Sequence, residues 1–268
     1  MPVTHEVDAE WVAGFAAGVG DRGDPQVAHP LFPVCVEWPA VTAAARLDDG
    51  ELLPDERRRG IHATHDLTIH RLLRPGDVLT TTATVDALEP HSRGTLERLR
   101  LETRDATGAV VATTVMGSLF LGVDIEGAPL EHDTHTASAA RDDAGDSHPA
   151  PVATAEIAVR ADQADLYSEG SRIWNPIHTD AGAAAAAGLP APILHGTCTL
   201  AMATSAALTL AGVTDASGLR RIRARFAGMV LMPSSLELRM TRRAERELQF
   251  EVFDPHGAAV IRDGRLTL

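Results

Sequence analysis

Cysteine, aromatic residues and positive charge are all scarce in this chain of 268 residues. Its two cysteines, Cys35 and Cys198, lie far apart in apolar runs, which favours reduced thiols that fill a core over a disulfide framework. The 24 basic residues are outnumbered by 37 acidic ones, for a formal net charge of -13. Because such a chain repels phosphate backbones and anionic lipid, we expect neither nucleic acid nor a membrane as a partner.

Long hydrophobic runs are missing too, so no segment can cross a bilayer. The stretch from Met1 to Asp8 lacks the basic region and apolar core of a signal peptide, and with reduced thiols this predicts a cytoplasmic protein. Hydrophobic residues still make up 44% of the chain. That content suffices for one large domain or two modest ones.

The segment 123–152 is rich in Asp, His, Ala, Gly and Pro and has few large apolar residues, which predicts a linker. It would separate an N-terminal repeat, 1–122, from a C-terminal repeat, 153–268. His132 and His135 in this segment have a spacing seen in metal sites, but no cysteine is near them. We therefore expect no metal site.

The two halves repeat one order of elements, in which an apolar helix follows a proline-punctuated loop and precedes several strands. In the first half we expect helices at 9–18 and 34–45 and strands at 61–69, 78–88, 95–103 and 110–121. In the second half we expect a strand at 153–160, helices at 180–187 and 194–210, and strands at 219–226, 236–241, 248–253 and 259–268.

The later of these helices is apolar on nearly every side over 197–210, as expected of a helix that is enclosed. An antiparallel sheet hides such a helix by wrapping around it. The sequence therefore predicts an α+β double hot-dog fold, with two repeats that each wrap a sheet around a long central helix.

Two motifs carry the functional information. Residues 167–180 read YSEGSRIWNPIHTD, and residues 188–196 read GLPAPILHG. Together they resemble the signature of the MaoC-like, (R)-specific enoyl-thioester hydratase family (hydratase 2), in which Asp-x-Asn-Pro-x-His precedes Gly-x-Pro-x-Pro-x-x-His-Gly. The resemblance covers the second half well, whereas the first half matches only the general hot-dog repeat.

The residue types suit acid-base chemistry on a thioester. Pro176 biases Asn175 toward extended backbone and so fixes the direction of His178. A histidine can take or give a proton near neutral pH, and an asparagine can orient water or the imidazole. Gly196, where the long helix begins, can offer a backbone N–H to the thioester oxygen. The resemblance thus implies His178, Asn175 and Gly196 as catalytic residues.

Other residues of the two motifs are expected to contact the substrate. Arg172 suits a carrier phosphate or is an ordinary solvated cation, Tyr167 faces substrate or packs beneath the loop, and His195 acts on substrate or orients the helix start. The resemblance further implies that 34–41 and its flanking strands form an acyl-chain channel. The expected substrate-binding residues are Tyr167, Ser171, Arg172, Ile173, Trp174 and His195.

The chain departs from the family pattern at Ile173, where the family has an aspartate that shares acid-base work with the histidine. Because isoleucine cannot exchange a proton, the reaction would recruit Glu169, Asp180, Ser171 or a substrate group, or else proceed through His178 alone. Loss of one such partner typically removes about 10²- to 10⁴-fold in rate.

The resemblance implies a hydratase or dehydratase that acts on an enoyl or 3-hydroxyacyl thioester of coenzyme A or an acyl carrier protein. It needs no cofactor beyond the pantetheine carrier of its substrate, and we expect a homodimer. The Ile173 departure leaves two alternatives open. One is a thioester-binding scaffold subunit, and the other is a different reaction such as hydrolysis, isomerisation or cyclisation in a biosynthetic pathway.

Overall fold

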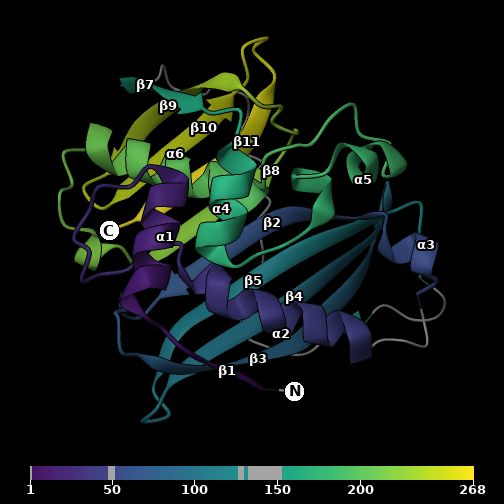
Figure 1. Ribbon diagram of the computed structural model, residues 1–268, viewed down its shortest axis with the longest axis horizontal. Coiled ribbons are helices and arrows are strands. Elements are labelled where there is room, and N and C mark those ends of the chain that lie inside the picture. The colour runs from purple at the N-terminus through teal and green to yellow at the C-terminus, as the bar shows by residue number, and fades with distance from the viewer. Residues whose placement is uncertain (1, 48–51, 126–129, 132–152) are drawn as a thin grey trace.

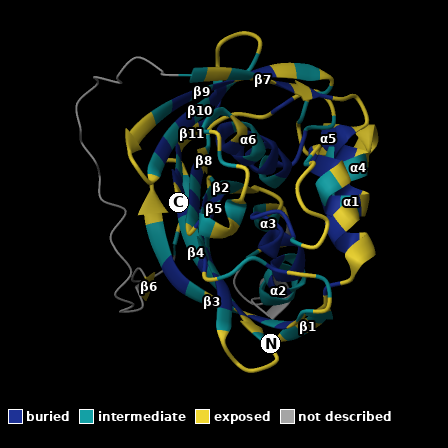
Figure 2. Cartoon of the chain, turned by 90° about the vertical axis from the view of Figure 1, so that its left-hand side faces the viewer, coloured by how far each residue is buried: buried dark blue, intermediate teal, exposed yellow. Residues whose placement is uncertain are grey.

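The computed structural model describes residues 2–47, 52–125, 130–131 and 153–268, and these form one curved sheet with the helices gathered on its inner side (Figures 1 and 2). The helices are α1 Ala9–Val19, α2 Pro33–Leu47, α3 Pro54–Arg57, α4 Gln163–Ser171, α5 Ala181–Ala186 and α6 Gly196–Leu210, with 3₁₀ turns η1 Pro176–His178 and η2 Ala216–Gly218.

All described strand pairs are antiparallel, and the order across the sheet is β1-β3-β4-β5-β2-β8-β11-β10-β9-β7, with β6 paired to β3. The strands are β1 Val3–Glu6, β2 Gly60–Ile69, β3 Val78–His91, β4 Gly94–Asp105, β5 Val110–Leu121, β6 Leu130–Glu131, β7 Ala153–Val159, β8 Arg221–Phe226, β9 Ser234–Ala244, β10 Glu247–Phe253 and β11 Ala259–Thr267.

The two repeats meet where β2 pairs with β8. In this seam His65 lies opposite Ala224 and Leu67 lies opposite Ile222, and all four side chains are buried. The sheet is therefore continuous across both repeats, with α2 over the first half and α6 over the second (Figure 1). The predicted α+β double hot-dog fold is confirmed.

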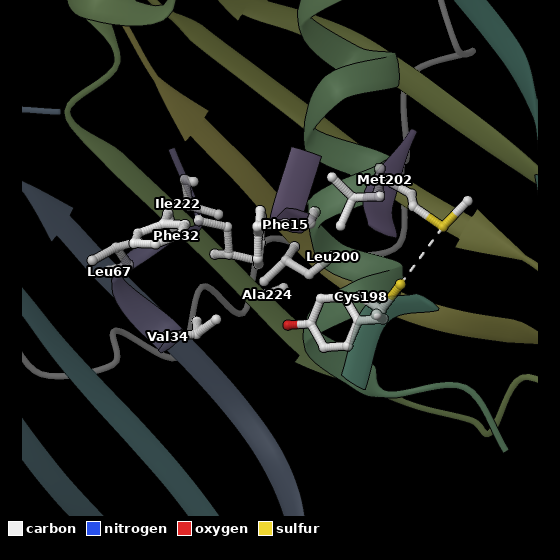
Figure 3. Packing of buried hydrophobic residues seen from close by; sticks show 14 of the residues in the cluster. Phe15, Phe32, Val34, Leu67, Cys198, Leu200, Met202, Ile222 and Ala224 are labelled. Atoms are coloured by element: carbon white, nitrogen blue, oxygen red, sulfur yellow. Dashed lines mark hydrogen bonds between the residues drawn. The ribbon is translucent and has the colours of Figure 1, made fainter. Parts of the chain in front are cut away.

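The core is shared between the repeats. Figure 3 shows Phe32 and Leu67 of the first repeat beside Ile222 of the second, all inside one large hydrophobic cluster. The sulfur atoms of Cys198 and Met202 lie 3.9 Å apart in the same cluster. Both cysteines are buried free thiols, as the sequence predicted.

Two helices were not predicted, the four-residue α3 and the longer α4. Residues 163–171, expected as a loop, form α4, which packs against α1. The two helices can touch because they meet at glycines: a Cβ built on Gly170 would lie 2.1 Å from the carbonyl oxygen of Gly14. The low apolar content of α4 hid this helix from the sequence pattern, since backbone contact replaces a hydrophobic stripe.

The predicted linker 123–152, with its histidine pair His132 and His135, lies mostly outside the described residues. Its described part includes β6. No helix in the described residues has the length and apolar character that a membrane span requires.

Candidate active site

Asn175 and Pro176 shape the loop that leads from α4 to His178. Asn175 is extended (φ -141°, ψ 118°), and its side-chain oxygen accepts a hydrogen bond of 3.4 Å from the N–H of Ile177. Pro176 begins the 3₁₀ turn η1, where a missing N–H costs nothing. Asn175 thus caps the turn, and the turn carries His178.

His178 has its tautomer set by one contact. Its Nδ1 lies 2.8 Å from the carbonyl oxygen of Ile193, just before α6. A carbonyl oxygen can only accept, so Nδ1 carries the proton and donates it in this bond. The other ring nitrogen, Nε2, therefore has a free lone pair, which is the form required of a general base.

The ring of His178 stacks on the ring of His195, with centroids 3.6 Å apart and planes inclined by 28°. His195 is buried and immediately precedes α6, and its Nε2 lies 3.3 Å from the hydroxyl oxygen of Ser168. Its Nδ1 is buried without a hydrogen-bond partner in the described part of the chain. This stack joins the two sequence motifs and holds His178 at the N-terminal end of α6.

Burial keeps both rings neutral. Burial lowers the pKa of His178, although the bond to the Ile193 carbonyl opposes the shift. Burial, and secondarily the charge that His178 would carry, lowers the pKa of His195 to about 2. At neutral pH His178 is therefore ready to accept a proton, and His195 presents an uncharged face to it.

Gly196 begins α6, and the N–H groups of a first helical turn have no carbonyl partner within the helix. They point at any oxygen placed beyond the helix end, where the helix dipole also favours negative charge. A Cβ on Gly196 would lie 3.2 Å from the ring of Phe226, which is tighter than most real contacts. The ring of Phe226 thus approaches the helix start closely because residue 196 is a glycine.

Tyr167 lies beneath this arrangement. It is fully buried, its hydroxyl donates to Oγ1 of Thr197 at 2.9 Å, and its ring centroid lies 4.9 Å from that of His195. Tyr167 thus packs beneath the first turn of α6, and its role with substrate stays a prediction.

The residues between Tyr167 and Asn175 differ in their burial and in their contacts. Arg172 ends α4, pairs with Asp8 at 2.9 Å, and stacks over the ring of Trp11 at 4.3 Å. Ser171 is buried, and its hydroxyl accepts from the N–H of Ile173. Trp174 is 59% exposed. The contacts of Arg172 tie the motif to the N-terminal repeat, and its role with substrate stays a prediction.

The place of the family aspartate is apolar. Ile173 is 5% exposed and belongs to the hydrophobic core. Glu169 is exposed on the outer side of α4, in a groove of about 380 Å³ between α1 and α4. Asp180 caps α5 by accepting from the N–H of Ala183 at 2.6 Å. Neither carboxylate contacts His178 in the described structure, and the hydroxyl of Ser171 is hydrogen-bonded to the N–H of Ile173. Nε2 of His178 is therefore the proton acceptor that this site offers.

Three contributors were missed by the sequence interpretation: the carbonyl of Ile193, the hydroxyl of Ser168 and the ring of Phe226. Ser168 and Ile193 lie inside the motifs and carried a signal, but Phe226 comes from a strand far away in the sequence. Among the described residues, no group of three or more His, Cys, Asp or Glu side chains could hold a metal ion.

Two family models match the chain. A MaoC-like domain matches residues 144–254, and a FAS1-like dehydratase region matches residues 2–114. The chain is similar to the enoyl-CoA hydratase ChsH3 of Mycobacterium tuberculosis, with 34% identity over 43% of this chain and 40% of that protein. It is also similar to the 3-hydroxyacyl-thioester dehydratase Y of the same organism, with 29% identity over 84% of this chain and 77% of that protein.

Other relatives are much longer than the segment that matches this chain. The peroxisomal multifunctional enzyme type 2 of Mus musculus is 35% identical over 36% of this chain and 13% of its own length. Among solved structures, a MaoC-like dehydratase from Phytophthora capsici superimposes with a TM-score of 0.84 and 22% identity, covering all of this chain and 94% of the other. At that identity the superposition demonstrates the fold alone.

Proposed function

Because this chain is a MaoC-like double hot-dog protein, we propose that it adds water to a 2-enoyl thioester, or removes water from a 3-hydroxyacyl thioester, with His178 as its one proton-transferring side chain. The observation that carries the proposal is the fixed tautomer of His178 at the start of α6. A base with a free lone pair and a set of backbone donors lie at the same end of one helix.

The thioester oxygen binds at the N–H groups of the first turn of α6, beginning with Gly196. Negative charge builds on this oxygen when a nucleophile attacks the β-carbon, so the donors stabilise the enolate-like state more than the substrate. Stabilisation of that kind is worth about 2.7–4 kcal/mol for one donor in other enzymes. Tyr167 and Thr197 keep this turn in place.

A single imidazole can move both protons. Nε2 of His178 takes a proton from water while the water oxygen bonds to the β-carbon, and the electron pair of the double bond moves to the thioester oxygen. The resulting imidazolium returns its Nε2 proton to the α-carbon as the enolate collapses. The elements of water are added and His178 regains its neutral form, so Ile173 need not be a carboxylate. Dehydration follows the same steps in reverse.

Hydration of crotonyl-CoA, followed by loss of the enoyl-thioester absorbance, tests this proposal. We expect turnover by the wild type, a fall of at least about 10²-fold in His178→Ala, and a much smaller effect of His256→Ala, which replaces an exposed histidine far from the site. If the wild type has no activity and still binds butyryl-CoA, the scaffold alternative takes its place. Release of free thiol would instead indicate hydrolysis.

The carrier and the assembly belong to the proposal as well. Coenzyme A and an acyl carrier protein share the pantetheine arm, and comparing crotonyl-CoA with crotonyl carrier protein in the same assay separates them. We also propose a homodimer, which light scattering on the purified protein measures directly.

A further inference from the structure

The two repeats differ in what their sheets turn toward their central helix. In the C-terminal repeat the inner face is apolar, with buried side chains such as Leu238, Phe250 and Leu266. In the N-terminal repeat, buried polar side chains interrupt the inner face. On the sheet they include His65 on β2, Thr81 on β3, Thr103 on β4 and Thr114 on β5, and Glu37 of α2 lies against Thr114.

Glu37 and Thr114 are hydrogen-bonded to each other inside this repeat. The hydroxyl of Thr114 donates to Oε1 of Glu37 at 2.7 Å, and both residues are at least 98% buried. Burial raises the pKa of Glu37 to about 7. Thr81 and Thr103 pair in the same way, with oxygens 2.9 Å apart. These groups satisfy one another and need no ligand to explain them.

His65 is different, because both of its ring nitrogens are buried and neither has a hydrogen-bond partner in the described part of the chain. It is 3% exposed, and burial lowers its pKa to about 3, so the ring is neutral. On the sheet it lies opposite Met116, one inward-facing position along from the pair of Leu67 and Thr114. A buried polar group without a partner destabilises the folded state, so its retention here calls for an explanation.

A row of rings connects His65 to the proposed thioester site. Phe226 lies against Gly196, and its centroid is 4.8 Å from that of His62, which in turn is 5.5 Å from that of His65. A register shift in β2 between His62 and Thr64 lets both histidines share the inner face. Phe226 and His62 are only half-buried although they face inward, whereas His65 beyond them is sealed. The three rings thus form a contiguous row on the inner face, from the start of α6 to His65.

We propose that the N-terminal repeat recognises a neutral hydroxyl group on the acyl chain, remote from the thioester, with His65 as its hydrogen-bond partner. The proposal rests on the function proposed above, because it takes an acyl thioester as the ligand. A neutral imidazole offers one donor and one acceptor, and a hydroxyl group offers the matching pair. An anionic chain end is disfavoured, because the repeat supplies no buried cation among these residues and Glu37 is acidic.

Binding of saturated acyl-CoA thioesters, which cannot be hydrated, tests this without turnover. Isothermal titration compares hexanoyl-, octanoyl- and decanoyl-CoA with their ω-hydroxyl counterparts, which carry the hydroxyl group to three depths. We expect one hydroxylated ligand to bind about tenfold more tightly than its plain counterpart, the effect of one buried neutral hydrogen bond. Equal affinities within all three pairs would overturn the proposal, and His65 would then be a desolvated core residue.

Variants assign the preference to His65. In His65→Leu we expect the tenfold preference to vanish while the plain chains keep their affinity within about twofold, and His65→Gln, which retains a donor and an acceptor, to keep part of it. His70→Leu is the matched control, because His70 directly follows the same strand, β2, but is exposed. A preference that persists in His65→Leu would overturn the assignment. The crotonyl chain carries no hydroxyl group for His65 to bind, so failure of the hydration assay tests the proposed reaction and not this site.

Discussion

Relative to wild type, the Glu37→Gln variant should be more stable at pH 8 than at pH 5. Glu37 is 2% exposed and burial raises its pKa to about 7, against 4.5 for an ordinary glutamate. A raised pKa means that the folded state holds the proton more tightly than the unfolded state. Its stabilising effect is therefore complete below pH 4.5 and is lost as the pH rises toward 7.

The magnitude follows from the two pKa values. At pH 8, ionisation of Glu37 costs the folded state about 3 kcal/mol, and at pH 5 it costs less than about 1 kcal/mol. Glutamine does not ionise, and its side-chain oxygen can still accept from Thr114. The buried amide N–H₂ has its own cost, but that cost is the same at both pH values. The free energy of unfolding of Glu37→Gln relative to wild type should thus rise by about 2.5 kcal/mol from pH 5 to pH 8.

Urea denaturation of both proteins at pH 5, 6, 7 and 8 measures this difference, with most of the change expected between pH 5 and 7. Every other titrating group is common to the two proteins and cancels. Glu169→Gln, which alters an exposed glutamate on α4, serves as the control and should show no such trend. A Glu37→Gln difference that stays constant with pH would refute the reasoning, because Glu37 would then ionise in the folded core as it does in water.

Three further predictions concern the site and the helix contact. Because burial lowers the pKa of His178, the acid limb of kcat/KM in hydration should lie below pH 6.5, and a limb above that value contradicts the assignment. Gly196→Ala should lower kcat/KM about tenfold, because the ring of Phe226 must shift to admit the new Cβ at the start of α6; unchanged activity would remove this turn from the site. Gly170→Ala should destabilise the fold by about 1–3 kcal/mol in urea, because its Cβ meets the carbonyl of Gly14, whereas Gly218→Ala, whose Cβ would meet no atom within 4 Å, should not.

Much of the fold could be predicted because the two repeats carry strong local patterns. The alternation of apolar and polar residues in β3 indicates a strand with one buried face, and the apolar surface of α6 on all sides indicates an enclosed helix. Helix α4 was missed because its contact with α1 is made by the backbone at Gly14 and Gly170, and glycine signals a turn when read from sequence. The four-residue strand β1 is too short to show a period.

The site was predictable only within its motifs. Asn175, His178 and Gly196 could be singled out from residue type and spacing, but the stacking of His178 on His195 requires two loops to meet in space. Likewise no local pattern distinguishes a tyrosine that faces a ligand from one that lies beneath a helix, as Tyr167 does. The contribution of Phe226 depends on the pairing of β8 with β2, which is a property of the whole sheet.

The pairing of β2 with β8 also bears on how the protein can be divided. Each repeat looks like a module in sequence, yet each would expose an unpaired strand edge along this seam if it were produced alone. The halves should accordingly aggregate when expressed singly and recover solubility when co-expressed, because each half covers the open strand edge of the other. The two repeats thus form an obligate pair, and exchange of a single repeat between relatives should succeed only where the new seam keeps the register of β2 against β8.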